Sequence, residues 1–420
     1  MNCKKINIKE GINLHIIKTD KFKTNLIAFF ITTQLNRGNV TQNALIPMVL
    51  RRGSREFPNI EQLNNKLDEM YGADFDCGVD KTGDNQVLKF YMESINNKFL
   101  PENENLLKES IELLLDIVLN PLNQDNSFDK SYIESEKEKL KQIIQGKKDN
   151  KAKYAYDRCI EEMYKNKPFA LYKYGFVEDL EKIDNINLYD YYKKLISECK
   201  IDIFISGEIE DGVENEIIQN KSIQKLNPRT PVYNKKSEKS NTVNKENIIN
   251  DKMDVAQGKL VLGLDIGINT KESKYAAIIY NAILGGSPTS KMFQNVREKE
   301  HLAYVAGSNY IRHKNNIFIR CGIEIGNYNK AVDLIKVQIE DMKKGNFTQE
   351  DLENAKTSII AVIRAVPEEQ DNEITYYFGQ EIAEHKMEYE EYEKKIKEVT
   401  KQDIIDIANS IKINTIYFLK

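Results

Sequence analysis

The chain has 420 residues, of which 40% are hydrophobic and 30% are charged, and its 61 basic and 65 acidic side chains leave a net charge of −4. This composition excludes a disordered chain and is typical of a globular protein with two or more domains. Because there is no basic excess, the charge balance also argues against a nucleic-acid-binding protein.

The five cysteines lie far apart, and no two of them have the spacing of metal ligands. Isolated thiols of this kind are typical of a reducing compartment. The first residues, MNCKKINIKEG, lack the apolar core of a signal peptide, and the apolar run at 27–32 is far too short to span a membrane. We therefore expect a cytoplasmic protein.

The first half contains six segments with clear strand or helix character. In chain order, β-branched and aromatic residues at 26–35 and 88–94 predict strands. A further segment of the repeat, at 67–80, lies between these two strands. Apolar residues at helical spacing predict helices at 105–121 and 128–144. The last segment lies at 200–209.

The second half repeats these six segments in the same order. They lie at 259–267, 299–310, 317–324, 328–345, 347–363 and 413–420. Any two domains that mix strands and helices share some likeness. The common order of six elements nevertheless favours a duplicated domain.

Residues 227–252 separate the two halves and are polar and charged, which is typical of a surface linker. We therefore predict an N-terminal domain at 1–226 and a C-terminal domain at 253–420. Each is large enough to bury roughly 70% of its unfolded surface. We expect an α+β fold in which each domain is a mostly antiparallel sheet with helices packed on one face. The two homologous domains are expected to face each other like a clam around a polar chamber.

The segment GGSPTSKMFQNVREKEHLAYVAGSNY begins at Gly285 and combines paired charges, a histidine and several tyrosines. It resembles the SSRLFQxIREKxGLAYxV signature of the insulinase/pitrilysin-like zinc metallopeptidases, in particular their short two-domain subunits. The resemblance covers nearly the whole chain. Some bacterial short members carry names tied to the modification of elongation factor P. The matching residues are Gly285, Gly286, Ser290, Phe293, Arg297, Glu298, Lys299, Leu302, Ala303 and Tyr304.

The resemblance also identifies a degenerate zinc motif. In active members an HxxEH helix supplies two zinc-binding histidines and the glutamate that activates water, and a later glutamate is the third ligand. Aligned through MVLRRGS, this chain has Ala44, Pro47 and Met48 at the His, Glu and His positions. The third-ligand position falls on Gln142 or Ile143, or on Glu138 in an alternative alignment. The resemblance therefore implies no metal or other cofactor in this chain, with zinc expected only on a partner subunit.

Pro47 also bears on the conformation of this helix. A proline in a helix interior removes a hydrogen bond and costs about 3 kcal/mol. We expect the helix to be kinked or to start late.

The four histidines, His15, His301, His313 and His385, are too scattered to replace the lost ligands. His15 lies in a strand-like stretch, His313 in a predicted turn and His385 in a predicted acidic helix. We interpret them as ordinary surface or packing residues.

Arg297 and Tyr304 are the candidate substrate-binding residues. In paired members of the family, one subunit carries the zinc motif, and the other supplies an arginine and a tyrosine that hold the substrate. The resemblance places these two roles on Arg297 and Tyr304. An arginine can bind a peptide carbonyl or carboxylate, and a tyrosine hydroxyl can donate to a developing oxyanion. The alternatives are an ion pair of Arg297 with Glu298, Glu300 or a partner helix, and core packing of Tyr304.

The sequence therefore predicts a non-catalytic, substrate-binding subunit of a heterodimeric zinc peptidase, with a homologous HxxEH-bearing partner and a peptide substrate. The chain alone could also form a homodimer. Two other hypotheses remain: a structural scaffold, like the family's core subunits in the respiratory bc complex, and a stand-alone peptide-binding chamber. Neither nucleic acid nor a membrane is an expected partner.

Overall fold

The computed structural model describes residues 3–101, 104–234, 238–268, 270 and 272–420. The chain forms two compact units. The first comprises Met1–Gln145, Leu171–Lys236 and Pro367–Lys386, and the second comprises Gly146–Ala170, Ser237–Val366 and Met387–Lys420. This division differs from the boundaries at 226 and 253, because each unit takes in one segment from the other half of the sequence.

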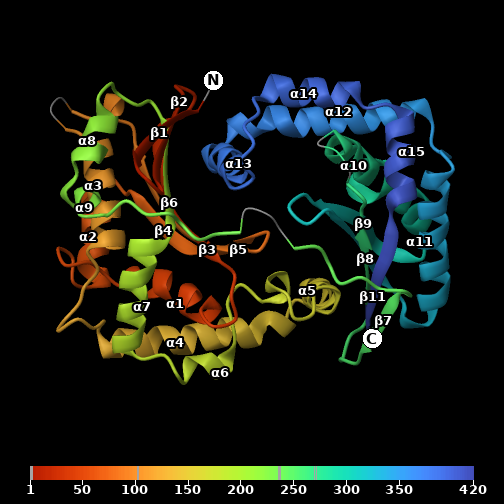
Figure 1. The fold of residues 1–420 in the computed structure, drawn as a ribbon, viewed down its shortest axis with the longest axis horizontal. Helices are drawn as coiled ribbons and strands as arrows, with labels where there is room; N and C mark the ends of the chain where they lie inside the picture. Colours follow the sequence, from red (N-terminus) through yellow and green to blue (C-terminus); the bar gives the residue numbers. More distant parts are fainter. Residues whose placement is uncertain (1–2, 102–103, 235–237, 269, 271) are drawn as a thin grey trace. The chain divides into compact units, whose positions relative to one another are not determined.

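A six-stranded sheet in the order β1-β2-β6-β3-β5-β4 forms the centre of the first unit (Figure 1). Strands β2 and β6 are parallel, and the other neighbours are antiparallel. Side chains alternate between the two faces of a strand. Ile27, Phe29 and Ile31 accordingly enter the main core of this unit. The strands are β1 (Lys4–Lys9), β2 (Ile12–Lys18), β3 (Thr24–Gln34), β4 (Asp74–Thr82), β5 (Asn85–Ile95) and β6 (Lys200–Gly207).

Helices cover the core side of this sheet. In α3, apolar residues recur at helical spacing and the Asn105 side chain caps the first turn, accepting from the Lys108 N–H at 3.0 Å. The helices of this part are α1 (Val40–Leu50), α2 (Ile60–Glu69), α3 (Leu106–Leu119), α4 (Lys130–Gln145), α6 (Val177–Leu180), α7 (Asn185–Glu198), α8 (Val213–Gln219) and α9 (Lys221–Gln224), with the short helix η1 (Asn97–Phe99).

The second unit has a five-stranded sheet in the order β7-β11-β8-β10-β9. Its outer pair β7 and β11 is parallel and the remaining pairs are antiparallel, as in the first sheet without β1. The strands are β7 (Asn247–Asp251), β8 (Gly258–Asp265), β9 (Ala303–Ile311), β10 (Asn316–Ile323) and β11 (Lys412–Leu419).

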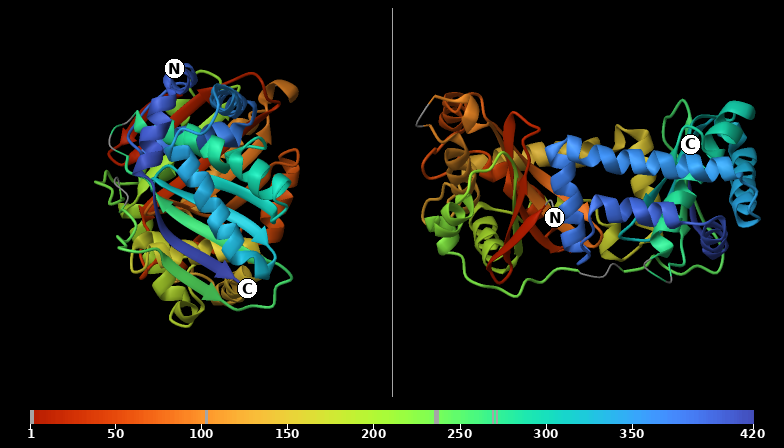
Figure 2. Two further views of the ribbon diagram at one scale, coloured as in Figure 1. Left: turned by 90° about the vertical axis from the view of Figure 1, so that its right-hand side faces the viewer. Right: turned by 90° about the horizontal axis from the view of Figure 1, so that it is seen from above.

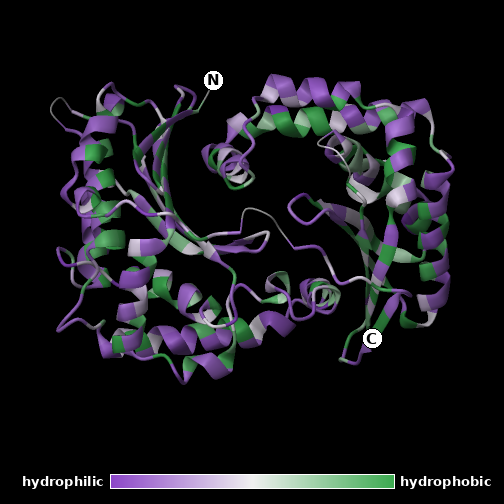
Figure 3. Cartoon of the chain, in the orientation of Figure 1, coloured by the Kyte–Doolittle hydropathy of each residue, from purple (hydrophilic) through white to green (hydrophobic). Residues whose placement is uncertain are grey.

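The long helices α12 and α14 of this unit lie side by side (Figures 1 and 2). Arg364 of α12 joins them through two hydrogen bonds to Glu393 of α14. Individual helices such as α3 and α12 carry both polar and apolar residues (Figure 3). The helical elements are η2 (Gly146–Lys148), α5 (Lys151–Met163), η3 (Pro168–Ala170), α10 (Ser273–Asn281), η4 (Ala282–Gly286), η5 (Met292–Lys299), η6 (Ile325–Asn327), α11 (Tyr328–Lys343), α12 (Gln349–Ala365), η7 (Val366–Glu368), α14 (Tyr389–Glu398) and α15 (Lys401–Ser410).

The six predicted repeat pairs are confirmed. Each pair consists of the same kind of element at the same place in the two units: β3 with β8, β4 with β9, β5 with β10, β6 with β11, α3 with α11, and α4 with α12. The α+β class with two homologous domains is therefore correct.

One helix from each half of the sequence packs on the sheet that the other half forms, on the face opposite the helical layer. Cys159 and Met163 of α5 pack with Val261 and Phe318 of the second sheet. Helix α13 (Gln370–Ile382) covers the first sheet, where its Phe378 ring lies 4.7 Å from that of Phe30. Each sheet therefore has helices packed against both of its faces.

The predicted linker at 227–252 contains a regular element that the composition did not indicate. Strand β7 pairs with β11 through Asn247–Asp251, while residues 235–237 lie outside the described residues. No helix within the described part of the chain is long and apolar enough to cross a membrane.

Candidate functional site

The degenerate motif lies on α1, which packs against α4, β4 and β5. Nine of its eleven residues are buried, as expected for a helix that is apolar on nearly all sides. Ala44 is only 2% exposed, Pro47 is buried and Met48 is half-buried. The positions that would carry zinc ligands therefore belong to the apolar core.

The prediction that α1 starts late is wrong. The helix begins at Val40 and passes through Pro47, whose carbonyl accepts the N–H of Arg51 at 3.1 Å. A buried hydrogen bond from the Asn43 amide to Gln86 of β5, 2.8 Å long, holds the helix on the sheet. Tertiary contacts thus hold the helix despite its internal proline.

The candidate third-ligand positions on α4 point away from such a site. Gln142, Ile143 and Glu138 are all exposed. The buried carboxylate of α4 is instead Glu136, which pairs with Arg52 just beyond α1. Among the described residues, no group of three or more His, Cys, Asp or Glu side chains is placed to hold a metal ion. The donor set of this chain does not fit zinc.

The retained signature segment in the second unit has an unusual backbone. Residues Met292–Lys299 wind as a π-helix, and the chain then enters the edge strand β9. Buried Met292 and Val296 fix one side of the turn, and Asn295 donates to Gln338 of α11 at 2.7 Å. Wide helical turns of this kind are rare in proteins as a whole, but those that occur are often at functional sites.

Arg297 and Tyr304 lie on this framework and both reach solvent. Tyr304 is 63% exposed, so the alternative of core packing is wrong. The Arg297 guanidinium lies over the Phe293 ring, 4.6 Å from its centroid, and its Nε is 3.4 Å from the Glu298 carboxylate. Both partners of this ion pair are about half exposed, and such a pair contributes only about 0–1 kcal/mol.

Known proteins similar to this chain identify its family. A family profile described as "Peptidase M16 inactive domain" matches residues 182–359. The Bacillus subtilis (strain 168) protein named "Probable inactive metalloprotease YmfF" is 33% identical over 411 residues, which cover 98% of this chain and 96% of that protein. The chain belongs to the peptidase M16 family. In agreement with its lost zinc ligands, it is a non-catalytic M16 homologue.

A further relative is similar over most of the chain, and solved structures share the fold over its full length. A second B. subtilis protein, "Uncharacterized zinc protease YmxG", is 23% identical and covers 77% of this chain and 78% of its own. The crystal structure of a conserved protein from Enterococcus faecalis V583 matches with a TM-score of 0.90 at 26% identity, covering 100% and 99% of the two chains. A peptidase M16 inactive domain from Pseudomonas fluorescens, 17% identical, matches with a TM-score of 0.80 over 100% and 98%.

The histidines of this M16 homologue have separate environments. His15 is buried in the first unit, while exposed His301 lies between η5 and β9 with a left-handed φ of 51°. Burial and the neighbouring Arg312 lower the pKa of His313. His385 follows α13 rather than lying within a helix, because α13 ends at Ile382.

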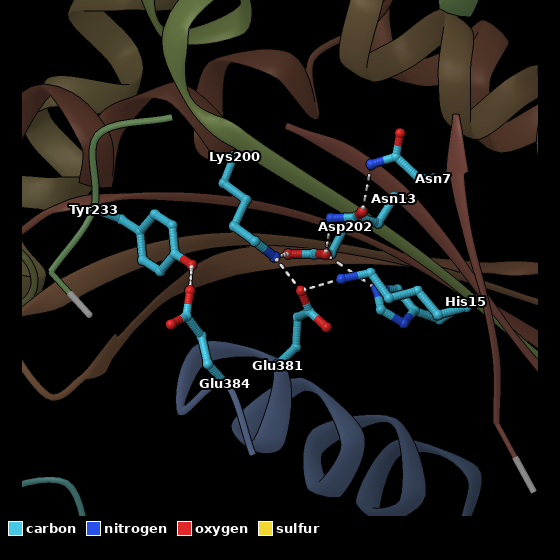
Figure 4. Close-up of polar contacts among 9 residues, drawn as sticks. Asn7, Asn13, His15, Lys200, Asp202, Tyr233, Glu381 and Glu384 are labelled. Atoms are coloured by element: carbon cyan, nitrogen blue, oxygen red, sulfur yellow. Dashed lines mark hydrogen bonds and ion pairs between the residues drawn. The ribbon is translucent and has the colours of Figure 1, made fainter. Parts of the chain in front are cut away.

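A buried ion cluster under α13, formed by Asn13, His15, Lys200, Asp202 and Glu381, was not predicted (Figure 4). Asp202 accepts from Asn13 and His15, both at 3.0 Å, and pairs with Lys200. Lys200 also lies 3.2 Å from Glu381 of α13. The cluster therefore joins α13 to the first sheet.

The charges of this cluster are mutually compensated. Burial alone would raise the pKa of Asp202, but Lys200 and His15 outweigh it and hold that pKa below its ordinary value. Burial likewise opposes ionisation of Glu381, and Lys200 together with Lys5 lowers its pKa. The only sequence signal was a short alternation of polar with apolar residues, at Asn13 and His15 in INLHIIK and at Lys200 and Asp202 in KIDIFISG.

Proposed function

We propose that this chain is the non-catalytic, substrate-binding subunit of a two-subunit zinc peptidase. The observation that carries the proposal is the contrast between the two halves of the family's site. The zinc positions are apolar, with Ala44 and Pro47 buried and Met48 half-buried. Arg297 and Tyr304, in contrast, are held by buried neighbours and remain exposed. Exposed side chains fixed by a packed segment are suited to bind a ligand.

The two side chains have complementary chemistry for a peptide. The planar Arg297 guanidinium can donate two parallel hydrogen bonds to a carboxylate or bind a backbone carbonyl. The Tyr304 hydroxyl can donate to an oxygen that gains negative charge during attack on the peptide bond. The zinc-activated water would come from the partner subunit, which carries HxxEH.

Two further observations support parts of this proposal, one the pairing and one the compartment. B. subtilis strain 168 has both a relative named as an inactive metalloprotease and a relative named as a zinc protease. None of the five cysteines, all of which lie within the described residues, forms a disulfide, which fits a reducing, cytoplasmic setting. A scaffold without a peptidase partner is the second candidate, because the Arg297–Glu298 pair could be purely structural.

Co-expression with an HxxEH-bearing homologue from the same organism tests the proposal. We expect the two chains to elute together in equal amounts and to hydrolyse a peptide library that neither chain hydrolyses alone. The control is the same complex with the partner's motif glutamate replaced by glutamine. Co-elution without hydrolysis would favour the scaffold, and separate elution would contradict both.

A further inference from the structure

A cationic cavity in the first unit lies apart from both regions described above. It has a volume of about 330 Å³, and its lining residues come from the C-terminal end of α7, from helix α9 and from the residues that follow α3. Four cationic residues line it: Arg55, Lys193, Lys225 and Arg229. Among the described residues that line it, none is Asp or Glu, although the whole chain has more acidic than basic residues.

Arg229 is the fixed cation of this cavity. It is 6% exposed, its N–H donates to the Glu10 carbonyl at 2.9 Å, and a Cβ at Gly11 would lie 2.5 Å from its Cγ. Its guanidinium donates to the main-chain carbonyls of Ile196, Cys199 and Asn227. These acceptors are neutral, so within the described structure no carboxylate compensates this buried charge. Burial accordingly lowers the pKa of Arg229.

The other cations differ in their freedom to bind a ligand. Lys193 already pairs with Asp190 at 2.8 Å, whereas Arg55 and Lys225 are exposed and have no carboxylate partner among the described residues. Because their side chains are long and mobile, these two can turn toward an anion next to Arg229 at little cost.

Two aromatic side chains complete the cavity. Tyr189 and Tyr192 are 7% and 4% exposed, and the Tyr192 hydroxyl donates to the Val118 carbonyl at 2.9 Å. The cavity is therefore lined by positive charge and aromatic rings. Its volume is at the lower end of the range for small-molecule sites, about 300–1,000 Å³.

We propose that this cavity binds a small molecule that carries a phosphate group. Phosphate matches the cations because it offers several charged acceptor oxygens within a few ångströms. The Arg55 guanidinium can donate to it bidentately, while Arg229, most of whose N–H groups already donate to main-chain carbonyls, contributes its positive charge. The cavity has more room than one phosphate needs, and the tyrosine rings can contact a planar organic group attached to it. Inorganic phosphate and a nucleoside monophosphate share this chemistry.

The test is calorimetric titration of the full chain with inorganic phosphate and with AMP, at constant ionic strength because exposed charges are screened by salt. We expect saturable one-to-one binding. Arg55→Gln combined with Lys225→Gln should weaken it about tenfold or more, while melting remains unchanged because both residues are exposed. The matched control is Lys108→Gln with Lys130→Gln, two exposed cations elsewhere on the same unit, which should leave affinity unchanged.

The two ligands distinguish the source of the phosphate. Tighter binding of AMP supports a nucleotide, and equal or weaker binding of AMP supports free phosphate. Absence of saturable binding for both ligands would overturn the proposal, as would equal weakening in the control variant, since that would indicate non-specific charge attraction. Neither outcome bears on the peptidase pairing.

Discussion

The two units share a topology but place their polar side chains differently. In the first, Lys200 and Asp202 are buried against α13, and the positions of the lost zinc motif are apolar. In the second, the signature segment and β9 keep Arg297 and Tyr304 in solvent. The positions aligned with the zinc motif thus lie mainly in a core, whereas the two signature residues stay accessible. Polar groups of the first kind should govern stability, and those of the second kind should govern ligand binding.

Helices α5 and α13, each of which packs on the sheet formed by the other half of the sequence, show the same difference. Helix α5 packs through apolar residues such as Met163 against Val261 and Phe318, and its Arg158 also pairs with Asp251 of β7, where both side chains are partly exposed. Helix α13 adds the more deeply buried ion pair of Glu381 with Lys200 to its aromatic contacts. Apolar contact is insensitive to pH, whereas ionic contact depends on protonation, so the attachment of α13 should be the more pH-dependent of the two.

Removing Lys200 should have the largest effect. Lys200→Met keeps most of the aliphatic stem but leaves the fully buried Asp202 without its cation, and breaking a buried pair in this way costs roughly 3–5 kcal/mol. Denaturant unfolding measures the loss. The matched control is Lys18→Met, because Lys18 pairs with Asp211 at an exposed site and should change stability by about 1 kcal/mol or less. Equal losses in the two variants would show that the buried cluster is not structural.

Restoring the zinc motif should be the next largest effect. Ala44→His, Pro47→Glu and Met48→His together place larger polar groups in a packed region, so we expect a loss of about 1–3 kcal/mol and no hydrolysis. The third-ligand helix offers only exposed residues at the aligned positions. Thermal unfolding and metal analysis after dialysis are the measurements. One zinc per chain together with peptide hydrolysis would show that the site is still preformed.

Acid should weaken the attachment of α13, with a smaller effect. The folded-state pKa values of Glu381 and Asp202 are lowered, so both carboxylates stabilise the fold above their unfolded pKa values, near 4. That stabilisation is lost as pH falls through the folded values. Glu381→Gln should therefore lose less unfolding free energy than the native chain as the pH falls from 5 to 3, the range in which ordinary carboxyl groups become protonated. Parallel pH profiles for the two proteins would argue against a role for Glu381.

The sequence predicted what depends on local pattern and order. Periodicity and the common order of six segments were enough for the duplicated α+β fold, and the signature segment was enough for the family. The exchange of α5 and α13 could not be predicted, because an amphipathic helix pattern does not specify which sheet the helix covers. Lys200 and Asp202 alternate visibly in β6, but their partner Glu381 is far away in the sequence. The exposure of Tyr304 could not be read from LAYVAGSNY, which suits either face of an edge strand.

The central claim is that Arg297 and Tyr304 serve a ligand rather than the fold. Melting temperature and turnover should be measured on the same samples of the complex with an HxxEH-bearing partner, for Arg297→Ala and Tyr304→Phe. The controls are Arg364→Ala and Tyr71→Phe, which alter exposed residues outside the signature segment. We predict melting within about 2 °C of the native complex and turnover lower by roughly one to three orders of magnitude in the two signature variants only. Unchanged turnover per folded complex in both signature variants, with or without a lower melting temperature, would contradict the account.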